Sequence, residues 1–328
     1  MSKEVELILG TMTFGPQVDD LDAAKMIELF TRAGHHELDA AYVYNEGETE
    51  RILGKIVDSD EVRLATKVNP RITGKLDADA VNSQFEESLS RLKRTSVDLL
   101  YFHFPDPSTP PEGPLEAVHK LYEEGKFKEF GLSNYPAWEV SKLYHLCDKY
   151  GWIRPTVYQG MYNALSRGVE SELFHAIRDF KMRFYAYNPL AGGLLSGKYS
   201  RFNDSPEPGR FTHRPNYKDR YWKESFFEAL DLIGKECEKE GITLVDAAFR
   251  WLAKHSFLDP SQGDGIIVGV SKLGHLEKNL SFIHKPNLPN NLLRSFDEAW
   301  ESTKKDEPSY FRYLPKKASI KPSSSYAG

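Results

Sequence analysis

The chain has 328 residues, a formal net charge of -5 and a sequence pI of about 6.1. With a mean hydropathy of -0.53 and no long apolar run, it gives no reason to expect a transmembrane helix. Its mild acidity gives no reason to expect a general affinity for nucleic acid or for anionic membranes.

Two features of the composition favour the cytoplasm. The first ten residues lack the basic region, apolar stretch and small-residue cleavage site of a secretory signal. The two cysteines, Cys147 and Cys237, lie in helix-like segments without CxxC or Cys/His ligand spacing. We therefore expect ordinary thiols in a reducing compartment, and no metal site.

Short β-rich segments alternate with longer amphipathic segments along the chain. The expected strands span residues 5–11, 36–41, 62–68, 97–104, 128–134, 156–162, 183–189 and 265–271. Between them, helical periodicity and terminal glycine or proline signals predict helices at 21–34, 77–93 and 136–151. Strict alternation predicts a parallel sheet, and eight such units fit a closed (β/α)8 barrel. A doubly wound open sheet is the alternative.

The seventh unit carries an insertion, because the interval 190–264 is too long for one crossover. It is expected to hold a long loop at 197–221, rich in proline and glycine, and then helices near 223–240 and 243–255. A further helix is expected within 286–306. We expect one domain over residues 1–315 and a disordered tail over 316–328, where small polar residues dominate.

Functional side chains of such a barrel gather at the carboxyl ends of its strands. The polar residues found there are Asp39, Lys67, His103, Ser133, Asn134, Gln159, Tyr187 and Asn188, with Tyr42 and Tyr44 in the loop after Asp39. Each alone has an ordinary structural interpretation, such as a helix cap or a surface charge. Their coincidence on so many strand ends favours a site at the rim.

A tyrosine, a lysine, an aspartate and a histidine together suit proton transfer to a carbonyl compound. A phenol with a pKa of about 10 is a poor acid at neutral pH, but a nearby ammonium stabilises the phenolate. An aspartate holds that ammonium, and a histidine orients the carbonyl oxygen. The phenol then protonates the alkoxide as it forms. Hydride has to come from a nicotinamide, since no side chain supplies it.

The segments around these residues resemble the signatures of the aldo-keto reductases. They read DAAYVYNEGETE, LATKV, VDLLYFHFPD, GLSNY, YQGMYN and YNPLAGGLLSGKY. The similarity covers about residues 5–312 and is closest to the aflatoxin-aldehyde/succinic-semialdehyde reductase branch, through GWIRPTVYQGMYNALSRGVESELF and RYWKESFFEAL. It implies that Asp39, Tyr44, Lys67 and His103 form the catalytic tetrad. Tyr44 rather than Tyr42 matches the acid, because it stands five residues after the aspartate.

The resemblance also implies an NADPH site. Ser133, Asn134 and Gln159 match the residues that hold the nicotinamide carboxamide, and Ser271 with Lys272 match the adenosine 2′-phosphate site. No GxGxxG fingerprint is present, which disfavours a Rossmann-type site. The full cofactor set implied is Met12, Asp39, Ser133, Asn134, Gln159, Tyr187, Asn188, Pro189, Leu190, Gly192, Gly193, Ser196, Lys198, Arg210, Gly269, Ser271, Lys272, His275, Lys278 and Asn279.

For the substrate, the resemblance implies contacts from Tyr44, His103, Arg220, Trp222 and Arg312. The two arginines match positions that bind a carboxylate or polar tail in this branch. The guanidinium fork suits that task because it donates two parallel hydrogen bonds. Surface charge is the other interpretation of both arginines.

The sequence therefore predicts NADPH-dependent reduction of aldehydes, with ketones or dialdehydes as further candidates and Tyr44 as the general acid. The alternative is a non-catalytic nucleotide-binding barrel that serves as a regulatory or scaffold subunit. The complete tetrad favours catalysis. We expect a small carbonyl compound as substrate and neither nucleic acid nor a membrane as partner. Whether the chain forms a homodimer is left open by the sequence.

Overall fold

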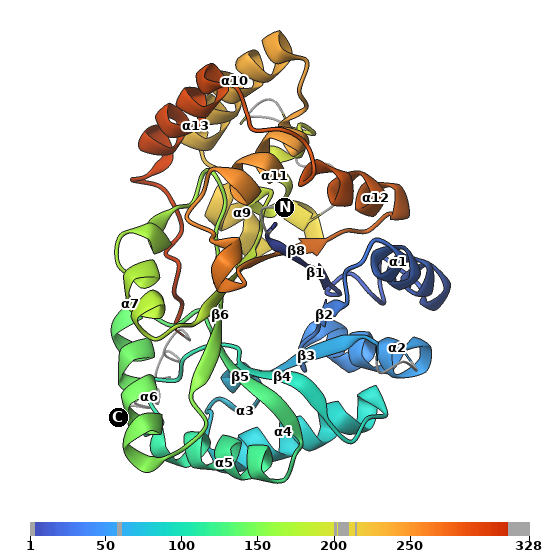
Figure 1. Cartoon of the computed structure of the whole chain (residues 1–328), viewed down its shortest axis with the longest axis vertical. Coiled ribbons are helices and arrows are strands. Elements are labelled where there is room, and N and C mark those ends of the chain that lie inside the picture. The colour runs from blue at the N-terminus through green and yellow to red at the C-terminus, as the bar shows by residue number, and fades with distance from the viewer. Residues whose placement is uncertain (1–3, 58–60, 200–201, 203–209, 214, 314–328) are drawn as a thin grey trace, which may run out of the picture.

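Eight parallel strands close into a barrel in the order of the sequence (Figure 1). The computed structural model describes residues 4–57, 61–199, 202, 210–213 and 215–313. The strands are β1 (Glu6–Gly10), β2 (Glu37–Asp39), β3 (Arg63–Val68), β4 (Val97–Phe102), β5 (Phe127–Ser133), β6 (Pro155–Met161), β7 (Arg183–Tyr187) and β8 (Gly265–Gly269). Every expected strand is present, so the predicted (β/α)8 barrel is confirmed and the open sheet is wrong.

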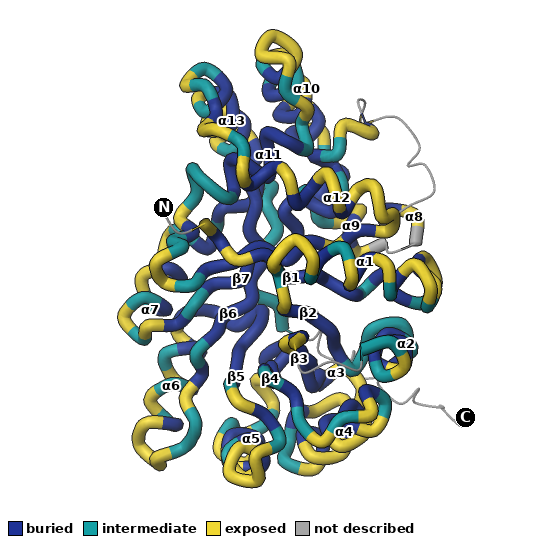
Figure 2. Tube along the Cα trace, turned by 45° about the vertical axis from the view of Figure 1, so that its right-hand side comes forward, coloured by how far each residue is buried: buried dark blue, intermediate teal, exposed yellow. Residues whose placement is uncertain are grey.

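Helices surround the barrel, and their outer faces are exposed while the strands are buried (Figure 2). They are α1 (Asp20–Arg32), α2 (Glu48–Ile56), α3 (Pro70–Thr73), α4 (Ala78–Leu92), α5 (Glu112–Glu123), α6 (Ala137–Tyr150), α7 (Leu173–Asp179), α8 (Arg210–His213), α9 (Pro215–Tyr221), α10 (Glu224–Glu240), α11 (Leu244–Lys254), α12 (Leu273–Phe282) and α13 (Asn290–Thr303). Short 3₁₀ helices are η1 (Tyr44–Gly47), η2 (Gly168–Glu170), η3 (Ala191–Ser196) and η4 (Pro260–Gln262).

Capping residues define where the long helices begin and end. Asp19 accepts from the backbone N–H of Asp22 at the start of α1, and Asp77 accepts from Ala80 at the start of α4. Gly151 ends α6 in the left-handed conformation that glycine adopts without strain. These signals explain why the periodic segments of the sequence became helices with nearly the expected bounds.

The segments outside the eight units also follow the sequence in outline. The expected C-terminal helix is α13, which packs beside α10 (Figure 1). The expected long loop after β7 contains the short helices α8 and α9. Residues 316–328, expected to be a disordered tail, lie outside the described residues.

Alternate residues of each strand face the barrel axis and form layers. The apolar interior of the barrel spans more than one of these layers and consists of Ile8, Ala65, Leu99, Tyr101, Val157, Tyr185 and Ile267. Gly131 leaves room for Tyr101 there, since a Cβ on Gly131 would lie 2.4 Å from the Tyr101 ring. This apolar interior separates the carboxyl-end rim from a charged layer at the amino ends of the strands.

Glu37 is the buried acid of that lower layer. Tyr185 donates its hydroxyl to Glu37 Oε2 at 3.1 Å, and Arg63 Nη2 lies 3.4 Å from the same oxygen. The other oxygen, Oε1, is buried and has no hydrogen-bond partner among the described residues. Burial raises the pKa of Glu37 to about 7, although Arg63 and Arg183 oppose the shift.

Glu37 should therefore make the stability of the fold depend on pH. A carboxyl group whose pKa is higher in the folded than in the unfolded chain binds protons more tightly when folded. Stability should then fall as pH rises from about 4 to about 7, by up to about 3 kcal/mol. Urea unfolding at several pH values should show this slope in the wild type and lose it in Glu37→Gln. Equal slopes in both proteins would contradict the assignment.

Candidate active site

A cavity of about 1200 Å³ opens at the carboxyl ends of the strands. It continues from the centre of the barrel rim to the groove beside α11 and α12. The structure brings the predicted site residues together here: among those whose side chains it describes, all line the cavity except Lys67, Trp222 and Lys272.

Lys67 and Asp39 form a buried ion pair under the cavity floor. Lys67 is fully buried, and its Nζ donates to both carboxylate oxygens of Asp39 at 2.7 Å and to the carbonyl of Ala40 at 2.5 Å. Gln159 Nε2 donates to Asp39 Oδ1 at 2.8 Å. Burial lowers the pKa of Lys67, and Asp39 opposes that shift. The ammonium lies 5.1 Å from the centroid of the Tyr44 ring, so it is next to the proposed acid.

The neighbours of His103 assign its tautomer. The amide oxygen of Asn69 accepts from the backbone N–H of Arg71 at 2.9 Å, which turns its Nδ2 toward His103 Nδ1 at 3.2 Å. Nδ1 is therefore the acceptor, and Nε2 carries the proton. Burial, with Lys67 nearby, holds the pKa of His103 well below its ordinary value. His103 is a neutral donor whose ring meets that of Tyr44 edge-on, with centroids 6.0 Å apart.

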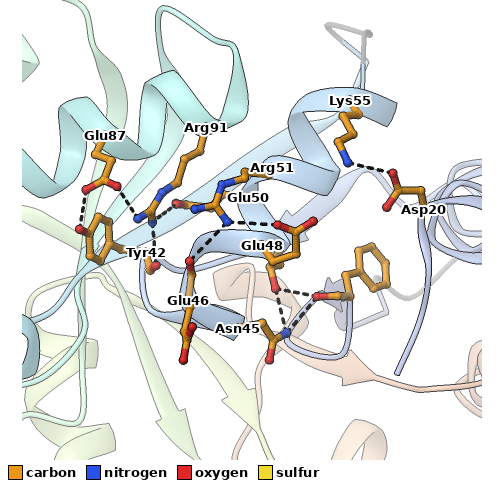
Figure 3. A network of polar contacts seen from close by, with 12 residues as sticks. Asp20, Tyr42, Asn45, Glu46, Glu48, Glu50, Arg51, Lys55, Glu87 and Arg91 are labelled. Atoms are coloured by element: carbon orange, nitrogen blue, oxygen red, sulfur yellow. Dashed lines mark hydrogen bonds and ion pairs between the residues drawn. The ribbon is translucent and has the colours of Figure 1, made fainter. Parts of the chain in front are cut away.

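The loop that carries Tyr44 has an unusual backbone. Asn45, Glu46 and Gly47 follow it with φ values of 49°, 56° and 84°, a left-handed region that suits glycine, that asparagine tolerates and that strains Glu46. A hydrogen bond offsets the strain of this backbone: the side-chain amide of Asn45 donates to the carbonyl of Phe14 at 2.9 Å (Figure 3). The polar loop is thus tied to the chain that follows β1.

Arg91 fixes the same loop from the other side (Figure 3). Its Nη1 donates to the carbonyl of Tyr42 at 3.0 Å and to the buried Glu50 at 3.2 Å, while Nη2 donates to Glu87 at 2.6 Å. Tyr42 itself donates to Glu87 at 2.6 Å. A Cβ on Gly47 would lie 2.4 Å from the guanidinium carbon. Tyr42, Gly47 and Glu50 are therefore explained by packing around Arg91, which supports Tyr44 as the acid.

Around the wall of the cavity, Asn134 joins several elements. It lies at a φ of 65° after β5 and donates from Nδ2 to the carbonyl of His103 at 2.9 Å. Its Oδ1 accepts from the hydroxyl of Tyr187 at 2.7 Å and from Arg312 at 2.8 Å. Asn134 and Tyr187, which the resemblance assigned to the cofactor site, are thus held in fixed positions.

Glycines of η3 shape the next part of the wall. Gly192 and Gly193 have φ values of 72° and 108°. A Cβ on Gly192 would lie 2.8 Å from the ring of Tyr217 on α9. The close approach of α9 therefore depends on glycine at this position.

The far end of the cavity offers donors suited to an anion. Ser271, His275, Lys278 and Asn279 line it after β8 and along α12. Burial, with nearby lysines, lowers the pKa of His275. Lys272 is the residue before α12 and does not line the cavity.

Of the other predicted residues, Trp222 is not among those that line the cavity. Trp222 is buried between Phe211 and Phe227 and donates its indole N–H to the carbonyl of Phe202 at 3.0 Å. Arg210 begins α8, and its side chain lies outside the described part of the structure. Lys67 lies below the floor, paired with Asp39.

Asn69 and Arg71 also line the cavity and were not predicted from the sequence. Asn69 stands two residues after Lys67, at a strand end and before a proline, which is a helix-capping signal that could have identified it. For Arg71, which lines the cavity from the following turn, no local pattern separates it from a surface arginine.

Comparison with known proteins shows the family. The model of the aldo/keto reductase family matches residues 6–301. This chain belongs to that family. Aflatoxin B1 aldehyde reductase member 2 of Mus musculus is 45% identical over 93% of this chain and 87% of its own length. The human aldo-keto reductase family 7 member A3 is 44% identical over 93% of this chain and 96% of its own length. The resemblance that the sequence segments indicated is confirmed.

Within the described residues of this reductase-family chain, no helix combines the length and the apolar composition needed to cross a membrane.

The Arg91 network should contribute strongly to stability. Arg91→Met leaves the carboxylate of Glu50, which is fully buried, without its cation, and should cost about 3–5 kcal/mol in urea unfolding. Adding Glu50→Gln should recover much of that loss. The matched control is Arg51→Met, whose ion pair with Glu48 is exposed and should matter by less than about 1 kcal/mol. Similar effects of the two arginine variants would show that the network does not hold the loop.

Proposed function

We propose that this chain reduces aldehydes to alcohols with NADPH, and that Tyr44 donates the proton. Ketones and dialdehydes are further candidate substrates. One observation carries the proposal: the buried Lys67–Asp39 pair lies beside the Tyr44 ring on the floor of a large cavity. The ammonium stabilises the phenolate that remains after Tyr44 gives up its proton. The names of the aflatoxin aldehyde reductases, similar over most of the chain, support an aldehyde as the substrate.

His103 complements Tyr44 in this proposal. Its Nε2–H is free to donate to a carbonyl oxygen, because Nδ1 is engaged by Asn69. Two donors then converge on one oxygen, which fixes its orientation and stabilises developing negative charge. Because His103 is neutral, the proton on the phenol is the one available for transfer.

The donor set of the cavity fits a nicotinamide dinucleotide. When bound, NADPH supplies the hydride that no side chain can supply. Ser133, Asn134 and Gln159 would hold the carboxamide: the amide of Gln159 uses its N–H on Asp39, which leaves its oxygen to accept. The glycines of η3 would lie along the pyrophosphate. Ser271, His275 and Lys278 would bind the 2′-phosphate beside the amino end of α12.

Arg220 and Arg312 are the proposed contacts for the polar part of the substrate. Both line the cavity, and Arg220 lies on α9 with its guanidinium carbon 4.9 Å from the Tyr217 ring. Trp222 is proposed to act indirectly, by packing the segment that carries Arg220.

The cytoplasm is the proposed location. Cys147 and Cys237 are both free and buried, and burial raises the pKa of each thiol to about 12. Such thiols are inert and suit a reducing compartment.

A non-catalytic nucleotide-binding barrel remains the competing function. It would need the wall and the far end of the cavity but not the buried ion pair. The desolvation of Lys67 and Asp39 costs several kcal/mol per ion, and the attraction between the two ions offsets that cost only when their geometry is good. The presence of the pair therefore favours catalysis.

Replacing Tyr44, the proposed acid, should lower turnover and leave the binding of NADPH nearly unchanged. Tyr44→Phe should bind NADPH with nearly wild-type affinity, since the ring is kept, but should lower turnover by about 10²–10⁴-fold. Fluorescence titration measures the first quantity, and single-turnover oxidation of NADPH measures the second. Wild-type single-turnover rates in Tyr44→Phe would remove Tyr44 from the mechanism.

The far end of the cavity should determine the choice of cofactor. Lys278→Ala should weaken NADPH binding by about 1.5–3 kcal/mol through loss of a charge-assisted contact, and NADH binding much less. Lys272→Ala, on a lysine outside the cavity lining, is the comparison and tests the sequence-based assignment. If Lys278→Ala weakened both cofactors equally, the 2′-phosphate would lie elsewhere.

A further inference from the structure

The C-terminal segment, residues 304–313, connects the outer helices to the wall of the cavity. It leaves α13 and runs past α7 to the end of β5 (Figure 1). The hydroxyl of Tyr310 accepts from the backbone N–H of Ala137, which begins α6, at 3.1 Å. The backbone N–H of Arg312 donates to the carbonyl of Asn134, which follows β5, at 3.0 Å. The side chain of Arg312 therefore reaches the rim from a fixed backbone.

That side chain binds two residues of the proposed cofactor site. Arg312 Nη2 donates to Asn134 Oδ1 at 2.8 Å and to the Tyr187 hydroxyl at 2.7 Å. The Tyr187 hydroxyl in turn donates to Asn134 Oδ1 at 2.7 Å. A guanidinium can only donate, whereas a tyrosine hydroxyl can donate or accept. Arg312 therefore fixes both the direction of the Tyr187 proton and the side of the Asn134 amide that carries the oxygen.

The amide of Asn134 is fully engaged within the protein. Because its oxygen faces Arg312 and Tyr187, its Nδ2 points the other way. Nδ2 donates to the carbonyl of His103 at 2.9 Å and to Ser133 Oγ at 2.9 Å. These contacts use both donors and both acceptor sites of the amide. Any effect that the Asn134 side chain has on a bound cofactor therefore passes through a neighbour.

The neighbour that Asn134 directs is Ser133. Ser133 Oγ accepts from Asn134, so its hydroxyl proton is available to donate into the cavity, which Ser133 lines. Gln159 is the partner of Ser133 in the pairing of β5 with β6. It uses its Nε2 on Asp39 at 2.8 Å and keeps its oxygen as an acceptor. One donor beside one acceptor is the complement of a primary carboxamide, which offers an oxygen and an N–H.

We propose that Arg312 is a positioning residue for the nicotinamide: it holds Asn134, Asn134 directs the Ser133 hydroxyl toward the carboxamide, and this contact fixes which face of the ring delivers the hydride. The inference rests on the proposed function and refines it, because it gives Arg312 a task on the cofactor side of the cavity and makes Asn134 act through Ser133. A nicotinamide rotated by half a turn about its bond to the ribose presents its other face, and its carboxamide then leaves Ser133 and Gln159. One defined pair of donor and acceptor therefore selects one face.

The stereochemistry of hydride transfer tests the proposal. Two NADPH preparations carry deuterium on opposite faces of the nicotinamide, and mass spectrometry of the alcohol formed from butanal shows which deuterium was transferred. The wild type should transfer it from one preparation only. Arg312→Met should raise the share transferred from the other preparation by about tenfold or more, and should slow single-turnover hydride transfer by a similar factor.

Two further substitutions at the same position separate orientation from size and polarity. Arg312→Lys keeps a group that can only donate, and should recover most of the stereoselectivity. Arg312→Gln can donate or accept, so it leaves the direction of the Asn134 amide undefined and should behave like Arg312→Met.

Arg71→Met is the matched control, since it removes a cation from the same cavity. The guanidinium carbon of Arg71 is 3.9 Å from the centroid of Phe104, the ring that Arg312 approaches to 5.2 Å. Arg71→Met should keep the stereoselectivity of the wild type. Full stereoselectivity in both Arg312→Met and Arg312→Gln would overturn the proposal. A loss of rate confined to carboxylated aldehydes would overturn it in favour of a substrate contact alone.

Calorimetry gives a readout that does not depend on turnover. NADPH and 2′,5′-ADP share the 2′-phosphate, but only NADPH has a nicotinamide. Arg312→Met should weaken NADPH binding by about fivefold or more, the loss expected for one net hydrogen bond, and should change 2′,5′-ADP binding by less than about twofold. Equal weakening of both ligands, or of neither, would overturn the proposal. If the wild type reduced no aldehyde, the proposed function would fail, and the comparison of these two ligands would still decide the role of Arg312.

Discussion

The rim of this barrel depends on one buried ion pair, Lys67 with Asp39. A fully buried ammonium is tolerated only when its hydrogen bonds are satisfied, and three oxygens do so here. Asp39 is in turn held by Gln159, from the far side of the barrel. Such pairs rarely increase net stability over an apolar core of the same size. Their value here is chemical, because they place a fixed positive charge beside a phenol at the base of a cavity.

Other parts of the structure hold the ion pair and the side chains around it in position. The Tyr101 ring, for which Gly131 leaves room, has its centroid 5.5 Å from the Lys67 ammonium and packs against the pair inside the barrel. The strained turn that follows Tyr44 is held in place by hydrogen bonds from the side chains of Asn45 and Arg91 to backbone carbonyls. Asn69 connects the neutral histidine to the loop of Arg71. Hydrogen bonds thus fix the positions of the groups that face the cavity.

Much of this could be predicted from the sequence, because the signals were periodic or local. Alternating strands and helices predicted the barrel, and polar residues at strand ends predicted the centre of the cavity, whereas the residues toward its far end were implied only by the family resemblance. The segment after β7 was harder: Pro215 and its neighbours suggest a loop, yet α9 forms where Tyr217 packs on Gly192. Trp222 was expected to touch substrate, but aromatic packing cannot be distinguished from pocket lining without tertiary contacts. Arg71 was missed for the same reason, since only the folded structure separates an arginine that lines the cavity from one on the surface.

The most direct test of the account is whether the purified chain oxidises NADPH in the presence of aldehydes. We expect NADPH to bind and to be consumed with at least one aldehyde among short, aromatic and carboxylated examples. Lys67→Met should bind NADPH but lose most of that turnover, because it removes the charge beside Tyr44. Tight NADPH binding with no oxidation by any aldehyde, in the wild type, would contradict the account and favour a nucleotide-binding scaffold.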